Sequence, residues 1–147
     1  MAAGLVVALL PKGRATHRRI GWVYVGAMLA LNATALLIYD LFGRFGPFHF
    51  AALVSLMSIA GGLLPAVRRK PRRRWVRIHA FAMSWSYVGL LAAAASEIST
   101  RYLRLPFWWL VLAATLMVVA IGGFIVQTRV PHAVARFERR RRRVEIA

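Results

Sequence analysis

The chain has 147 residues, 60% of them hydrophobic, and carries 21 Lys and Arg against four Asp and Glu, which gives a formal net charge of +17. The hydrophobic share exceeds the roughly 45–50% of an ordinary soluble domain and indicates a membrane protein. With no cysteine, the sequence excludes a disulfide framework, a thiolate metal site and a thiol nucleophile.

The chain begins with a short apolar stretch, "MAAGLVVALL", which as a helix covers about 15 Å, or half of a bilayer's hydrocarbon core. Positive charge follows this stretch, whereas in a signal peptide it precedes the apolar run. Two interpretations stay open: a short helix lying in the membrane interface, or the last half of a spanning helix whose start is missing from this chain.

Four longer apolar segments follow, each close to the ~20 residues that a helix needs to cross a bilayer, and none contains Lys or Arg. We expect spanning helices at about residues 20–39, 50–67, 78–96 and 105–126, with the middle loop beginning near Pro65. Short connections make consecutive helices antiparallel neighbours. The predicted fold is therefore all-α, a transmembrane up-down four-helix bundle with an additional apolar N-terminal half-helix. Residues 1–128 are expected to form a single integral membrane domain, and residues 129–147 a basic cytoplasmic tail.

The basic residues gather at one end of these helices: before the first, between the second and third, and after the fourth. At the other end lie only Arg44, Arg101 and Arg104. By the positive-inside rule, both termini and the middle loop are cytoplasmic, in the cell inner membrane. The basic excess is then a topology signal that also attracts anionic lipid headgroups, and we expect no nucleic acid partner.

Two histidines are the main candidates for holding a cofactor. His79 shares a helical face with Met83 and Ser86, and His17 shares one with Met28. If both faces turn inward, the two rings approach each other at the cytoplasmic end. Three interpretations stay open: a haem b held by His17 and His79 with Met83 nearby, a transition-metal site that lacks the usual carboxylate or thiolate, or histidines that hydrogen-bond headgroups and backbone.

Two acidic residues, Asp40 and Glu97, are predicted at the outer ends of helices. Each is followed four residues later by arginine, in the pairs Asp40–Arg44 and Glu97–Arg101, and this is the spacing at which an acid and a base pair on a helix. They are interpreted as interfacial ion pairs or, alternatively, as parts of a proton or substrate relay.

Polar residues near mid-membrane offer another kind of site. They either hydrogen-bond between helices or line a small cavity for a ligand. The cavity candidates are Asn32, Ser55, Ser58, Ser86 and Tyr87. The sequence has no Ser–His–acid triad, phosphate-binding glycine loop or paired-carboxylate motif, so no catalytic residue is predicted.

Two stretches carry a family resemblance: "LLPKGRATHRRIGWVYVGAM" and "WVRIHAFAMSWSYVGLLAAAASE", followed by "STR". They resemble a family of bacterial multi-pass predicted membrane proteins of unknown function, over about residues 3–128. The resemblance implies a topology and a set of positions but no activity. Members of the family have a complete apolar helix before the KG…HR motif, and this chain departs from that pattern because it starts at "MAAGLVVALL". The recurring positions are Lys12, Gly13, His17, Arg18, Gly21, Tyr24, Met28, Trp75, His79, Met83, Ser86, Tyr87 and Arg101.

We therefore expect a multi-pass, non-enzymatic protein of the cytoplasmic membrane that serves as a scaffold engaging lipids, a membrane-protein partner or a second copy of itself. One alternative is a haem b-binding membrane redox protein using His17 and His79, an arrangement similar to that of membrane b-type cytochromes. Another alternative is a small-ligand transporter or binding protein with a mid-membrane polar cavity.

Overall fold

The computed structural model describes residues 2–9, 15–38, 43, 45–71 and 74–146. In these parts of the chain it contains five helices: α1 (Ala2–Leu9), α2 (Ala15–Leu37), α3 (Pro47–Arg68), α4 (Trp75–Tyr102) and α5 (Phe107–Ile146). The last four are long and apolar enough to cross a membrane, α5 over its Phe107–Arg139 part. The predicted all-α bundle of four long helices with a short N-terminal helix is confirmed.

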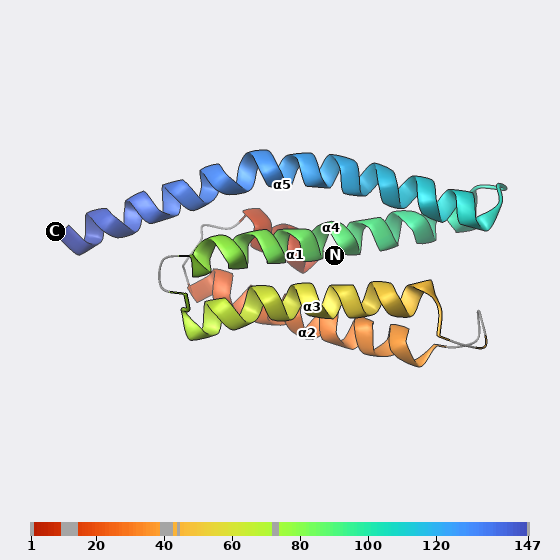
Figure 1. Ribbon diagram of the computed structural model, residues 1–147, viewed down its shortest axis with the longest axis horizontal. Coiled ribbons are helices and arrows are strands. Elements are labelled where there is room, and N and C mark those ends of the chain that lie inside the picture. The colour runs from red at the N-terminus through yellow and green to blue at the C-terminus, as the bar shows by residue number, and fades with distance from the viewer. Residues whose placement is uncertain (1, 10–14, 39–42, 44, 72–73, 147) are drawn as a thin grey trace.

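The long helices pack in chain order (Figure 1). α2 lies against α3, α3 against α4 and α4 against α5, so that α3 and α5 flank α4. α1 packs on α2 and also touches α4, because Gly4 fits against the rings of Tyr24 and Tyr87. A Cβ atom added at Gly4 would lie only 2.5 Å from the Tyr87 ring. The short helix therefore covers the place where α2 and α4 meet.

One end of the bundle is strongly basic. α2 begins, α3 ends and α4 begins at this end, and α5 extends past it toward the C-terminus (Figure 1). We call it the basic end, and define it by the exposed residues Arg18, Arg19, Arg68, Arg69, Arg74 and Arg77. The opposite end holds the start of α3 and the turn between α4 and α5, with Arg101 and Arg104.

The connection between α3 and α4 begins later than the sequence indicates. The expectation that the middle loop starts near Pro65 is wrong, because α3 continues through Pro65 to Arg68. Proline inside a helix removes one backbone hydrogen bond, and such a loss is tolerated in membrane helices where neighbouring groups compensate for it. The next residue, Arg69, caps the helix with a left-handed φ of 52°.

α5 is much longer than the predicted fourth span. Its 40 residues extend over about 60 Å, twice the thickness of a hydrocarbon core. The helix passes residue 128, the predicted end of the membrane domain, without a break. Val126 and Val134 are buried and Val130 and Phe137 half-buried, a spacing that places them on one helical face. The beginning of the predicted basic tail thus carries an apolar stripe.

Large apolar side chains cover the outside of the bundle. Met57 is 73% exposed, Trp109 69% and Phe124 71%, and they lie on α3 and α5. Soluble proteins rarely expose contiguous apolar surface of this kind, whereas in a bilayer lipid chains cover it.

Candidate functional site

A buried core lies between α2, α3 and α4. Tyr24, Val25 and Met28 of α2 are buried against Ile59 of α3. Partly buried residues of α3 and α4 surround them: Leu63, Met83, Tyr87 and Leu90.

A buried hydrogen bond links α2 to α4 in this core. Tyr24 Oη and Ser86 Oγ lie 2.9 Å apart, and the Tyr24 ring meets the Tyr87 ring edge-on with centroids 6.4 Å apart. The two helices both start at the basic end and therefore run parallel. His17 precedes Tyr24 by seven residues, as His79 precedes Ser86. Two turns, or about 10 Å, thus separate each histidine from this bond, toward the same end of the bundle.

His79 is anchored to the neighbouring helix α3. Its Nδ1 atom lies 2.9 Å from the carbonyl oxygen of Gly62. A carbonyl oxygen only accepts, so Nδ1 is the donor of this hydrogen bond. Met83, one turn further along α4, also presses on Gly62: a Cβ atom added there would lie 2.9 Å from Met83 Sδ. The absence of a side chain at Gly62 is what allows this approach.

Asn32 is the most deeply buried polar side chain of α2, at 2% exposure. Its Nδ2 atom donates to the carbonyl oxygen of Met28 at 2.7 Å and to Ser55 Oγ of α3 at 3.0 Å. The structure therefore brings together two of the five cavity candidates, Asn32 and Ser55, in a contact between helices. Ser86 bonds Tyr24 as described above, and Ser58 donates to the carbonyl oxygen of Val54 in its own helix.

The polar residues near the opposite end have local structural partners. His49 Nδ1 accepts a hydrogen bond of 3.1 Å from the backbone N–H of Gly46 and so caps the start of α3. Arg101 Nε donates to Glu97 Oε1 at 2.6 Å, and both side chains are largely exposed. The other predicted ion pair, Asp40 and Arg44, lies outside the described residues.

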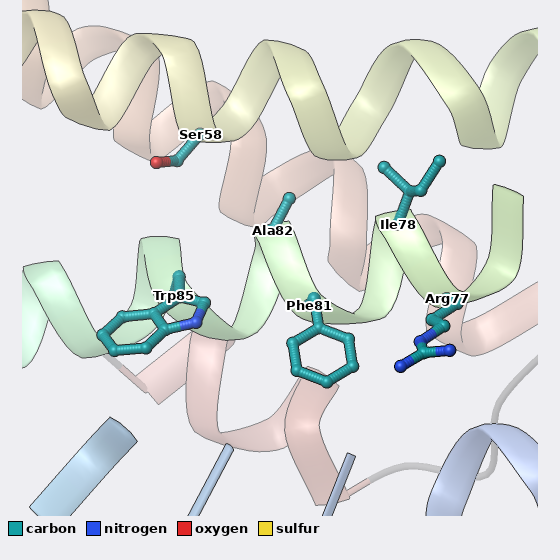
Figure 2. Close-up of a pocket in the computed structure, with 6 residues that line it drawn as sticks. All are labelled: Ser58, Arg77, Ile78, Phe81, Ala82 and Trp85. Atoms are coloured by element: carbon teal, nitrogen blue, oxygen red, sulfur yellow. The ribbon is translucent and has the colours of Figure 1, made fainter. Parts of the chain in front are cut away.

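A groove runs along α4 near the basic end (Figure 2). It has a volume of about 580 Å³ and lies between α3 and α4. Arg77, Phe81 and Trp85 project from α4 toward the same side, and the Arg77 guanidinium lies 5.9 Å from the centre of the Phe81 ring. The lining residues are Ser58, Arg77, Ile78, Phe81, Ala82 and Trp85.

Sequence reasoning missed this groove and one polar contact. Apart from Ser58, no lining residue was a candidate, although Ile78, Phe81, Ala82 and Trp85 follow one helical face at a spacing visible in the sequence. The contact joins Ser96 Oγ of α4 to Thr115 Oγ1 of α5 at 3.1 Å.

The described residues contain no group of three or more His, Asp or Glu side chains that could hold a metal ion.

A model of the family described as "Predicted membrane protein (DUF2306)" matches residues 1–135. The chain belongs to this family. The predicted resemblance is thereby confirmed, and the DUF2306 match extends beyond residue 128 to residue 135, within α5. The DUF2306 chain is a membrane protein with four apolar helices. No curated protein and no solved structure matches it.

Proposed function

We propose that the chain is a non-enzymatic scaffold of the cytoplasmic membrane, with both termini and the α3–α4 connection in the cytoplasm, and that its basic end binds anionic lipid headgroups. The observation that supports this is the concentration of exposed Arg and Lys at the basic end, including Arg68, Arg69 and Lys70. At the described part of the opposite end, Arg101 is paired with Glu97. Each Lys or Arg near an anionic surface contributes about 1 kcal/mol of binding.

The interior of the bundle supports a scaffold. Two pairs of its polar side chains bond each other across helix interfaces, Tyr24 with Ser86 and Asn32 with Ser55. Hydrogen bonds of this kind hold membrane helices together and fix their register.

The orientation can be tested by cysteine labelling, because the natural chain has no cysteine. Single variants Lys70→Cys and Leu103→Cys place a thiol at the basic end and in the α4–α5 turn, both exposed. In intact cells a membrane-impermeant maleimide should label Leu103→Cys, and it should label Lys70→Cys only after permeabilisation. The reverse pattern, or equal labelling of both, would contradict the proposed orientation.

A second candidate function is haem b binding by His17 and His79. The common register of these residues on two parallel helices supports it. Metal-binding histidines commonly donate their other ring N–H to a backbone carbonyl, as His79 does to Gly62.

The absorption spectrum separates the two candidates. Protein purified from haem-replete cells should show a Soret band and split visible bands if the histidines hold haem, and either His17→Ala or His79→Ala should abolish them. His132→Ala, an exposed position on α5, is the matched control and should keep the spectrum. A colourless natural protein eliminates the haem candidate.

A further inference from the structure

The groove on α4 lies where this helix packs against α3. α3 and α5 lie on different sides of α4 (Figure 1), and Ser58 of α3 lines the groove together with residues of α4. Ile78, Phe81, Ala82 and Trp85 form a continuous apolar stripe on this part of α4. Trp85 lies next to α5, since a Cβ atom added at Gly123 would come within 3.0 Å of its indole ring. Ser58 of α3 lines the side of the stripe that faces α3, and α5 approaches the stripe at Trp85.

The two ends of the groove differ in chemistry. Arg77 stands in the first turn of α4, at the basic end, and is exposed. Trp85 lies eight residues further into the bundle, about 12 Å along the helix axis. Ser58, the other polar lining residue, already donates its hydroxyl to Val54, so the inner part of the groove requires no polar partner. A ligand matching this groove has a negative head and an apolar tail.

We propose that the groove binds one anionic phospholipid of the leaflet at the basic end, with the phosphate at Arg77 and one acyl chain along the stripe toward Trp85. The charge of Arg77 selects the headgroup, and the apolar side chains of the stripe contact the acyl chain (Figure 2). This inference rests on the proposed function, from which it takes the contact between the basic end and an anionic leaflet.

The test uses tryptophan quenching by lipids with brominated acyl chains. The full chain has five Trp, and two single-Trp variants, with the other four changed to Phe, retain either Trp85 in the groove or Trp75 at the basic end outside it. Both are reconstituted in phosphatidylcholine with a small equal fraction of brominated phosphatidylglycerol or brominated phosphatidylcholine. For each variant, the quenching efficiency with brominated phosphatidylglycerol divided by that with brominated phosphatidylcholine measures the headgroup preference at its tryptophan. Circular dichroism checks the helical content.

We expect the Trp85 variant to prefer phosphatidylglycerol about fivefold, which is the contribution of one basic residue near an anionic surface. Adding Arg77→Gln should remove this preference, whereas the matched change Arg74→Gln, also exposed but outside the groove, should leave it. Ser58→Phe should fill the groove and reduce quenching of Trp85 by both lipids.

Two outcomes would overturn the proposed groove site, and only the second also contradicts the proposed function. The groove is not the lipid site if quenching of Trp75 shows a preference for phosphatidylglycerol while quenching of Trp85 shows none. The same follows if Arg77→Gln leaves the preference measured at Trp85 unchanged. In both cases the proposed function, a scaffold that binds anionic lipid, is not contradicted. If neither tryptophan reports a preference for the anionic lipid, both the groove and the proposed function fail.

Discussion

At the scale of single residues, the interior of this bundle depends on a few hydrogen bonds. The Tyr24–Ser86 bond joins α2 to α4, and Asn32 joins α2 to α3 through Ser55. A polar group without a partner in hydrocarbon costs several kcal/mol, which explains why these buried groups are paired. The sequence singled out Asn32, Ser55 and Ser86 because they are polar residues in apolar segments. The sequence does not reveal which groups these side chains bond, because that depends on how each helix is rotated about its axis.

The Tyr24–Ser86 bond should be measurable as a coupling between two residues. Tyr24→Phe, Ser86→Ala and the double variant form a cycle whose coupling energy we expect near 0.6 kcal/mol, with an upper range of about 1.7 kcal/mol. Unfolding by sodium dodecyl sulfate in mixed micelles gives the free energies. The pair Tyr24 and Thr34 is the control, because the Thr34 hydroxyl bonds Leu31 in its own helix and should show no coupling. Absence of coupling between Tyr24 and Ser86 would contradict the described contact.

At the scale of helices, close packing depends on glycines that face a neighbour. Gly62 of α3 packs against Met83 of α4, and Gly122 of α5 packs against Val88 of α4. At both glycines the neighbouring side chain leaves no room for a Cβ atom. In lipid, apolar burial drives little association between helices, so close backbone approach supplies much of the packing. The sequence shows that small residues such as Gly and Ala recur in the apolar segments. The sequence does not show which glycine faces a neighbouring helix. A Cβ atom added at Gly61, beside Gly62, would have no neighbour within 4 Å.

The adjacent glycines provide a matched test of the α3–α4 contact. We expect Gly62→Val to destabilise the protein by about 1–3 kcal/mol, because its side chain forces Met83 and Ala82 away and lengthens the bond from His79 to the backbone of α3. Gly61→Val, which adds the same atoms on the exposed side, should change stability by less than about 0.5 kcal/mol. Micellar unfolding measures both. Equal effects would show that Gly62 does not set the distance between the helices.

At the scale of the whole molecule, the asymmetry of charge is the dominant feature. The basic end carries Arg or Lys on α2, α3 and α4, and the α3–α4 connection alone holds a dense basic run. Positive residues in short loops resist transfer across the membrane, so their sum over one end directs insertion. This property adds residue by residue and needs no tertiary contact.

Neutralising part of the basic end should therefore weaken the orientation. In the variant with Arg68, Arg69, Lys70 and Arg74 all changed to Gln, we expect some molecules to insert inverted, seen as a lower labelled fraction of Leu103→Cys in intact cells. Changing Arg104 to Gln is the control at the opposite end, and it should leave labelling complete. Unchanged labelling of the fourfold variant would show that these charges do not determine the topology.

The sequence by itself determined the membrane class, the four long helices and the family. Composition, segment length and charge placement are properties of the linear chain, and they identify spanning helices without knowledge of packing. Only the tertiary structure decided that His79 bonds Gly62, that α5 continues as one helix past Pro131, and that a groove forms beside Phe81 and Trp85. The physical reason is that lipid is as apolar as the side chains, so lipid-facing and helix-facing surfaces look alike in sequence. Lipid-facing and helix-facing surfaces become distinguishable only through the contacts between helices that form when the chain folds.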